Sequence, residues 1–214
     1  MTFKAVIFDI DGVLADSDEA ISRSFINTMT KHGFKAPTKE KVQQSIGADA
    51  RTWIINLLPD NKKQDEELIK KMTEYSSLAY KEVYMPILIQ PAKNAIETLK
   101  KLQNTCEIAI ATNNPRDTTE KLLKIINMDF VKTVVTSTDV ENPKPAADPI
   151  LKAIKELNAK KEECLFIGDT LADIQAANAA GISVALKNQK YNQKIDCKIR
   201  ITELDEVFKI VNSN

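Results

Sequence analysis

The chain lacks the features that mark several classes of protein. Its 214 residues carry 30 Lys and Arg against 30 Asp and Glu, so the net charge gives no reason to expect nucleic acid as a partner. No apolar run approaches the roughly 18 residues that a membrane span needs. The N-terminus lacks the basic, apolar and cleavage regions of a signal peptide. We therefore expect a cytoplasmic protein with no membrane partner.

Cysteine and histidine are also scarce. Cys106, Cys164 and Cys197 are far apart in the sequence and form no CxxC pair. They are expected to be reduced thiols, mostly in the core. His32, the only histidine, stands near the expected end of a helix, where a structural role is expected. Any chemistry is therefore sought among other residue types.

Hydrophobic periodicity divides the chain into two regions. Residues 18–83 indicate helices only, expected at about 18–32, 38–46, 50–58 and 64–84. From about residue 87, helices alternate with short buried strands, expected at 107–112, 132–137, 164–169, 182–186 and near 197–201. With a first strand near residues 6–10, this alternation predicts an α/β fold, a Rossmann-like parallel sheet with helices on both faces. Residues 1–16 and 85–214 are expected to form this core, and residues 17–84 a small all-helical cap inserted after the first strand.

Polar residues follow several of the expected strands. In open parallel sheets, ligands bind at the carboxyl ends of the strands, so these residues should meet at one edge. They are Asp9 and Asp11 after the first strand, Thr112 and Asn113 after the second, Lys144 between two prolines after the third, and Asp169 with Asp173 after the fourth.

This set of side chains suits phosphoryl transfer. Asp9, Asp169 and Asp173 provide oxygen ligands for a hard cation such as Mg²⁺, which would also offset the repulsion between the carboxylates. Thr112 and Lys144 are donors for phosphoryl oxygens. One carboxylate, best assigned to Asp9, could attack phosphorus, while the Asp11 carboxyl protonates the leaving oxygen.

Each residue also has an ordinary structural interpretation. The Asp9 and Asp11 pair could form a turn, Thr112 and Asn113 could do the same, and Lys144 could be a surface lysine. Asp173 could simply stabilise the N-terminus of a helix. The functional interpretation is favoured because these features share one edge and form a chemically complete set.

The motifs closely resemble those of the haloacid dehalogenase-like hydrolase superfamily, in its phosphoglycolate phosphatase and β-phosphoglucomutase-like branch. "DIDGVLADS" is similar to the family's DxDGxxxDS motif, and "ATNN" to a hydroxyl residue that ends a strand. "NPKPAADP" resembles the lysine loop, and "GDTLADIQAANAAGI" the GDxxxDxxAAxxAG motif. The resemblance spans nearly the whole chain, the helical insertion included.

The resemblance implies a role for each of these residues. Asp9 would be the nucleophile that forms an aspartyl-phosphate, and Asp11 the general acid and base. Thr112, the Asn113 backbone and Lys144 would bind phosphate. Mg²⁺ would be held by the Asp9 carboxylate, the Asp11 backbone carbonyl and Asp169, with Asp173 behind them or acting through water.

Two departures weaken the mutase alternative. Ile21 stands where β-phosphoglucomutases have a hinge histidine, and Arg51 lies one position later than their cap arginine, counted from Gly47. In the cap, Gly47, Asp49, Arg51 and Trp53 are candidates to face the substrate. Arg51 could meet a substrate carboxylate or a second phosphate, although a solvated helix arginine is the simpler expectation, and Trp53 is expected to pack inside the cap.

The sequence therefore predicts a Mg²⁺-dependent phosphatase acting on a small phosphorylated metabolite, such as phosphoglycolate or a sugar phosphate. The alternative within enzymes is a phosphomutase, which returns the phosphoryl group to a sugar. The non-enzyme alternatives are a receiver-like signalling domain and a catalytically silent phosphate-binding protein. A receiver would be about half as long and would lack the insertion.

Overall fold

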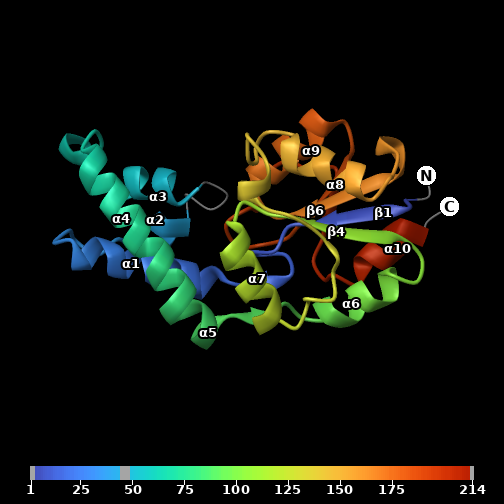
Figure 1. Cartoon of the computed structure of the whole chain (residues 1–214), viewed down its shortest axis with the longest axis horizontal. Coiled ribbons are helices and arrows are strands. Elements are labelled where there is room, and N and C mark those ends of the chain that lie inside the picture. The colour runs from blue at the N-terminus through green and yellow to red at the C-terminus, as the bar shows by residue number, and fades with distance from the viewer. Residues whose placement is uncertain (1–2, 44–48, 213–214) are drawn as a thin grey trace. The chain divides into compact units, whose positions relative to one another are not determined.

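The computed structural model describes residues 3–43 and 49–212, which group by their contacts into two units. The sheet unit comprises Met1–Asp16 and Gln90–Asn214, and the helical unit comprises Ser17–Ile89. Figure 1 shows the strands in the first unit, and helices α1 to α5 in the second. The helical unit thus interrupts the sheet unit in the sequence.

The sheet unit contains a six-stranded parallel sheet in the order β5-β4-β1-β6-β7-β8. This confirms the predicted α/β class. Its strands are β1 (Ala5–Phe8), β4 (Glu107–Ala111), β5 (Thr133–Val135), β6 (Cys164–Gly168), β7 (Ser183–Lys187) and β8 (Ile199–Ile201). A short antiparallel pair, β2 (Ala15–Asp16) with β3 (Gln90–Pro91), forms where the chain leaves this unit and returns to it.

Helices cover both faces of the sheet. They are α6 (Ala95–Leu102), α7 (Arg116–Ile125), α8 (Asp148–Glu156), α9 (Leu171–Ala180) and α10 (Glu206–Asn212). Figure 1 shows α8 and α9 on one face and α6 and α10 on the other. All four residues of β1 are buried, because a strand at the centre of such a sheet has no solvent-facing side. Ile7 packs in one core cluster with Ile150 of α8 and Ala177 of α9.

The strand order places a topological switch point at β1. The chain runs from β1 to β4 and β5 on one side, and then to β6, β7 and β8 on the other. The backbone ladder continues past the strands, since Asp9 N–H donates to Ile167 O and Thr112 N–H donates to Val135 O. The loops that follow β1 and β4 therefore start from fixed positions at the edge where such folds bind ligands.

The helical unit is built from α1 (Asp18–Lys31), α2 (Lys39–Gln43), α3 (Ala50–Leu57), α4 (Glu66–Ala79) and α5 (Met85–Leu88). Its core holds Phe25, Trp53, Ile54 and Met72, with the rings of Phe25 and Trp53 stacked at 4.4 Å. The expected packing role of Trp53 is thus confirmed.

The helical region runs further than the sequence pattern predicted. A π-helical turn, Tyr80–Tyr84, follows α4, and α5 continues to Leu88 with Pro86 in its first turn. Proline is tolerated there because the first N–H groups of a helix have no intrahelical partner. The contacts accordingly group residues through Ile89 with the helices, whereas the sequence pattern placed the return to the sheet at residue 85.

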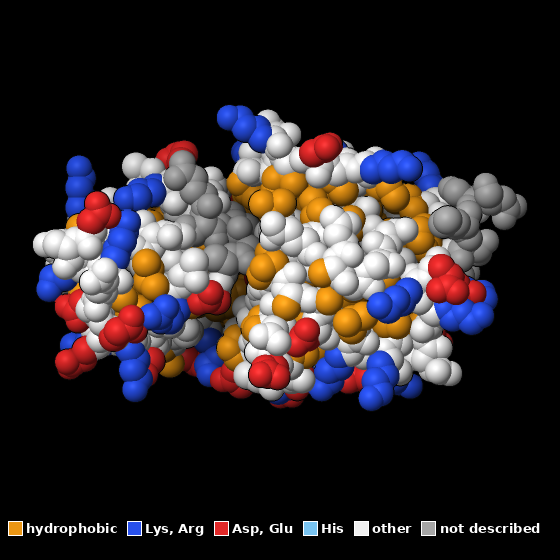
Figure 2. Space-filling model, turned by 90° about the horizontal axis from the view of Figure 1, so that it is seen from above, with side chains coloured by type: hydrophobic (Ala, Val, Ile, Leu, Met, Phe, Trp, Pro, Cys, Tyr) orange, Lys and Arg blue, Asp and Glu red, His pale blue; other side chains and the backbone are white. Residues whose placement is uncertain are grey.

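Charged side chains of both signs cover the face of the helical unit seen in Figure 2. Lys63 pairs with Asp60 and Lys62 with Asp65, each three residues apart. None of the described helices combines the length and apolar character needed to cross a membrane.

Candidate active site

The centre of the site is a buried lysine held between two carboxylates. Lys144 Nζ lies 2.9 Å from Asp9 Oδ1 and 2.7 Å from Asp173 Oδ1. All three residues are buried, and the ammonium also lies 5.5 Å from the centre of the Phe166 ring. A lysine with so little access to water needs such charge partners. The interpretation of Lys144 as a surface lysine is therefore wrong.

Asp173 is occupied by contacts that fix it in place. Its Oδ2 accepts hydrogen bonds from Thr170 Oγ1, Thr170 N–H and Asp169 N–H at 2.6, 3.0 and 3.2 Å, while its Oδ1 accepts from Lys144. With Thr170 it forms a capping box at the start of α9. A Cβ at Gly168 would overlap the Asp173 side chain, so glycine is needed at that position. Asp173 thus both caps a helix and holds Lys144.

Asp169 has one oxygen held and one oxygen open. Tyr191 OH donates to Oδ2, and Asn192 Nδ2 donates to the Asp169 backbone carbonyl at 2.7 Å. Its Oδ1 is buried and has no hydrogen-bond partner among the described residues. The turn at Gly12, with a φ of +73°, passes so close that a Cβ there would overlap Asp169 Oδ2.

Asp11 is not one of the three clustered carboxylates, and its carboxylate has a neutral hydrogen-bond partner. Asn114 Nδ2 donates to Asp11 Oδ2 at 2.6 Å, and Asn114 N–H donates to Thr112 Oγ1 at 3.2 Å. Thr112 is almost completely buried, and its hydroxyl retains a hydrogen to donate. Asn114 thereby connects the loop after β4 to the loop after β1.

Asn113 acts on the lysine loop through its side chain. Its Nδ2 donates to Lys144 O at 2.9 Å, and its Oδ1 accepts from Lys144 N–H at 3.0 Å. This two-way pairing holds the backbone of Lys144, which is followed by a cis peptide bond to Pro145. The predicted contact of the Asn113 backbone with phosphate stays a prediction.

Burial and neighbouring charges shift the pKa values of the site. Burial, opposed by Lys144, and the neighbouring Asp173 and Asp11 raise the pKa of Asp9 to about 7. Burial, together with Asp173 and Asp9, also raises the pKa of Asp169 well above its ordinary value. Burial opposes the charge on Lys144, but Asp173 and Asp9 outweigh it and raise its pKa. The positive charge of Lys144 therefore does not offset the negative charges of Asp9, Asp169 and Asp173 together.

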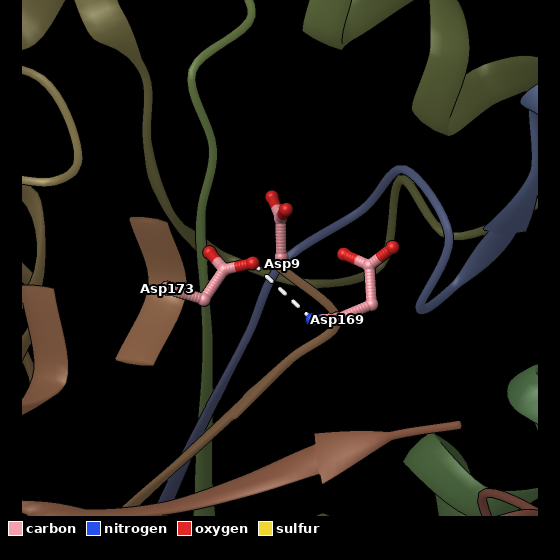
Figure 3. A group of neighbouring side chains, drawn as sticks. All are labelled: Asp9, Asp169 and Asp173. Atoms are coloured by element: carbon pink, nitrogen blue, oxygen red, sulfur yellow. Dashed lines mark hydrogen bonds between the residues drawn. The ribbon is translucent and has the colours of Figure 1, made fainter. Parts of the chain in front are cut away.

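The donor set fits a hard divalent cation. One carboxylate oxygen from each of Asp9, Asp169 and Asp173 lies within 4.8 Å of the others, and Figure 3 shows the three side chains together at the ends of β1 and β6 and the start of α9. Two groups are best placed to bind such a cation. One is Asp169 Oδ1, which has no hydrogen-bond partner, and the other is the Asp9 carboxylate, whose Oδ1 lies near Lys144 Nζ but outside hydrogen-bond geometry. Asp173 Oδ1 and Oδ2 already accept bonds, so an indirect role suits it better.

The candidates in the helical unit have partners of their own. Arg51 NH2 meets both carboxylate oxygens of Glu66, at 2.8 and 2.7 Å, on an exposed surface. Asp49 caps α3 by accepting from Thr52 N–H, and His32 bonds Thr28 O, as expected for a structural residue. Gly47 lies outside the described residues. A role of Arg51 in specificity stays a prediction.

Sequence reasoning missed the residues that support the site from outside the motifs. Asn114 stands one residue beyond the predicted phosphate-binding pair, so its place at a strand end was the available signal. Tyr191 and Asn192 follow β7 by four and five residues and carry no recognisable pattern. Only the folded chain brings them to Asp169.

Comparison with known proteins identifies the family. The sequence profile of the haloacid dehalogenase-like hydrolases matches residues 6–187. The chain belongs to this family. The match runs from Val6 in β1 to Lys187 at the end of β7, and thus includes every strand end that contributes to the site. Membership in this hydrolase family agrees with the resemblance of the four motifs.

Curated members of the family match over nearly their full length. A protein named pyrophosphatase PpaX from Halalkalibacterium halodurans is 30% identical over 219 residues, covering 99% of this chain and 98% of that protein. Another pyrophosphatase PpaX, from Bacillus cereus, is 29% identical and covers 100% of this chain and 98% of its own.

Two solved structures share the fold of this chain. A predicted phosphoglycolate phosphatase from Haemophilus somnus has a TM-score of 0.86 at 22% identity, covering 98% of both chains. A haloacid dehalogenase-like hydrolase from Streptococcus pneumoniae has a TM-score of 0.83 at 21% identity, covering 97% of this chain and 98% of that one. At these identities the likeness establishes the fold alone.

Proposed function

We propose that this protein is a Mg²⁺-dependent phosphatase that hydrolyses a small phosphorylated metabolite through an aspartyl-phosphate. The observation that carries the proposal is the buried Asp9 carboxylate, which lies 2.9 Å from the Lys144 ammonium and beside the open oxygen of Asp169. With Mg²⁺ bound at Asp169, the metal and the Lys144 ammonium would together favour the ionised form of a nucleophile at this position. The sheet unit, Met1–Asp16 and Gln90–Asn214, would then be the catalytic core, and the helical unit, Ser17–Ile89, a cap domain.

In the first step, an oxygen of Asp9 attacks the phosphorus of the substrate. The bond from Asp9 to phosphorus forms as the bond from phosphorus to the leaving oxygen breaks, and Asp11 gives that oxygen a proton. Lys144, Thr112 and the backbone N–H of Asn113 would hold the phosphoryl oxygens, whose negative charge these donors stabilise.

In the second step, water displaces Asp9 from phosphorus. Asp11, now ionised, takes a proton from the water as its oxygen attacks, and inorganic phosphate leaves with the Asp9 carboxylate restored. Asn114 Nδ2 donates to Asp11 Oδ2 at 2.6 Å and so helps to orient the carboxyl that exchanges the proton. When bound by Asp9, Asp169 and the Asp11 carbonyl, Mg²⁺ would supply positive charge against the transferring phosphoryl group.

The named relatives widen the set of substrates to be tested. The curated relatives are called pyrophosphatases, and a structural relative is called a predicted phosphoglycolate phosphatase. Both kinds of substrate present a terminal phosphoryl group that the same core residues could attack. We therefore place pyrophosphate beside phosphoglycolate, sugar phosphates and nucleotides as candidates.

A phosphate-release screen over such compounds tests the proposal. With Mg²⁺ we expect release from at least one compound, and with EDTA we expect the rate to fall to background, because the buried carboxylates then lack their cation. The same metal should raise the melting temperature, since a ligand that binds only the folded state stabilises it. Silence on every compound, together with no labelling of Asp9, would overturn the proposal. A labelled Asp9 without phosphate release would indicate a phosphomutase.

Replacing Asn114 by alanine is expected to impair the acid more than the nucleophile. Without the Asn114 donor, Asp11 is less well placed to protonate the leaving oxygen, and general acid catalysis contributes roughly 10²-fold or more. We expect kcat to fall roughly tenfold for alkyl phosphates, which need that proton, and much less for p-nitrophenyl phosphate. Asn104→Ala, which removes an exposed bond to the Lys100 backbone carbonyl, is the control. Equal losses on both substrates would assign Asn114 a purely structural role.

A further inference from the structure

One segment of the sheet unit contacts both of the loops that carry the carboxylates. Residues 187–192, at the end of β7 and just beyond it, meet the loop after β1 and the loop after β6. Toward the second loop, Tyr191 OH donates to Asp169 Oδ2, and Asn192 Nδ2 donates to Asp169 O at 2.7 Å. The side chain and the backbone of Asp169 are thus held by two consecutive residues.

The same segment holds the turn that follows Asp9 and Asp11. Lys187 Nζ and Gln189 Nε2 both donate to the backbone carbonyl of Gly12, at 3.1 and 2.5 Å. Lys187 is buried, although it takes no part in the proposed reaction. The turn at Gly12 is therefore tied to the same segment as Asp169.

The segment is itself firmly anchored. Asn192 is fully buried, donates to Lys187 O at 2.8 Å and accepts from Gln189 N–H at 2.9 Å. From β8, the Arg200 guanidinium donates to Asn192 O and Oδ1 and to Ile195 O. The backbone around Tyr191 is thus held in place, as is required of a residue that orients another side chain.

We propose that Tyr191 is a positioning residue of the metal site, which it serves by fixing the rotation of the Asp169 carboxylate. The inference rests on the metal site proposed above and adds a residue from outside the family motifs. The Tyr191 hydroxyl donates to Asp169 Oδ2 and leaves Asp169 Oδ1 buried and without a hydrogen-bond partner. Asp169 belongs to the cluster in which one carboxylate oxygen each of Asp9, Asp169 and Asp173 lie within 4.8 Å of one another. Partners of this kind orient metal ligands, and their loss commonly weakens metal binding.

Titration with Mn²⁺ followed by electron paramagnetic resonance tests this without any substrate. Mn²⁺ accepts the same oxygen ligands as Mg²⁺, and the signal of the free ion yields the Kd directly. We expect Tyr191→Phe, which removes only the hydroxyl, to raise the Kd roughly tenfold or more. The matched control is Tyr75→Phe in the helical unit, whose hydroxyl accepts from Asn27 Nδ2 at 3.2 Å. It should leave the Kd unchanged.

The outcomes separate this inference from the proposed function. Binding by the wild type with an unchanged Kd in Tyr191→Phe would overturn the positioning role and leave the metal site standing. No binding by the wild type would overturn both. Melting temperatures in EDTA show whether each variant is folded. A lower melting temperature with an unchanged Kd counts against the inference, because it would assign Tyr191 a role in stability alone.

Discussion

Replacing Asp9 by asparagine is expected to lower phosphate release by roughly 10⁴-fold or more, as losses of a catalytic nucleophile do. The amide has nearly the same shape as the carboxyl but is a poor nucleophile and a poor cation ligand. The measurement is the initial rate of phosphate release with Mg²⁺ on the best substrate of the screen. Asp129→Asn, at an exposed position of the sheet unit, is the matched control and should keep full activity.

The same variant should remain as stable as the wild type in EDTA at pH 8. The pKa of Asp9 is raised to about 7, so the folded state binds its proton more tightly than the unfolded state does. Proton binding by Asp9 therefore stabilises the folded state at low pH. This stabilisation is lost as the pH rises through 7, because the buried carboxylate then carries a charge that destabilises the folded state. A neutral amide avoids the charge, so the melting temperature should not fall. Retained activity, or loss of activity through unfolding, would contradict the assignment of Asp9 as the nucleophile.

Replacing Lys144 by methionine is expected to cause the largest loss of stability. Methionine fills a similar volume but leaves Asp9 and Asp173 buried without their cation, and breaking a buried pair in this way costs roughly 3–5 kcal/mol. For a chain of this length, that corresponds to a fall in melting temperature on the order of 10 °C. Thermal unfolding in EDTA at pH 8 measures it. Activity should also be lost, since no ammonium then faces the phosphoryl group.

A second substitution separates the loss of charge from the loss of packing. In the double variant with Asp173→Asn, one of the uncompensated carboxylates is removed, so part of the lost stability should return. Lys152→Met removes a lysine that contacts a backbone carbonyl, Asp139 O, and should change stability little. A loss below about 1 kcal/mol for Lys144→Met, or no recovery in the double variant, would show that the buried ion pairs matter less than their geometry indicates.

The sequence by itself determined the fold class and the edge at which the polar residues gather. Residues 108–111 and 164–168 are short runs of buried residues between helices, and this alternation of strands and helices is a local pattern that leaves few arrangements other than a parallel sheet. The positions of Asp9, Thr112 and Asp169 follow, because each stands directly after a strand. Even the likeness to the haloacid dehalogenase-like hydrolases is carried by short motifs.

The partners of these residues were decided only by the tertiary structure. Burial of Lys144 depends on Asp9 and Asp173, which are 135 and 29 residues away in the sequence, and no local pattern specifies such a pairing. Side chains alternate between the two faces of a sheet only while the chain is in a strand. Asp9 and Asp11 follow the end of β1, so Asp11 contacts Asn114 while Asp9 contacts Lys144.

Which carboxylate oxygens of the site have hydrogen-bond partners depends on the same long-range packing. Both carboxylate oxygens of Asp173, a metal-ligand candidate in the sequence, accept hydrogen bonds, which come from Thr170, Asp169 N–H and Lys144. Asp169 keeps one oxygen without a partner because Tyr191 donates only to the other. Hydrogen bonds are short-range and directional, so which oxygen stays free is determined only when distant segments meet. The sequence thus named the carboxylates, and the fold decided which of their oxygens are available to a cation.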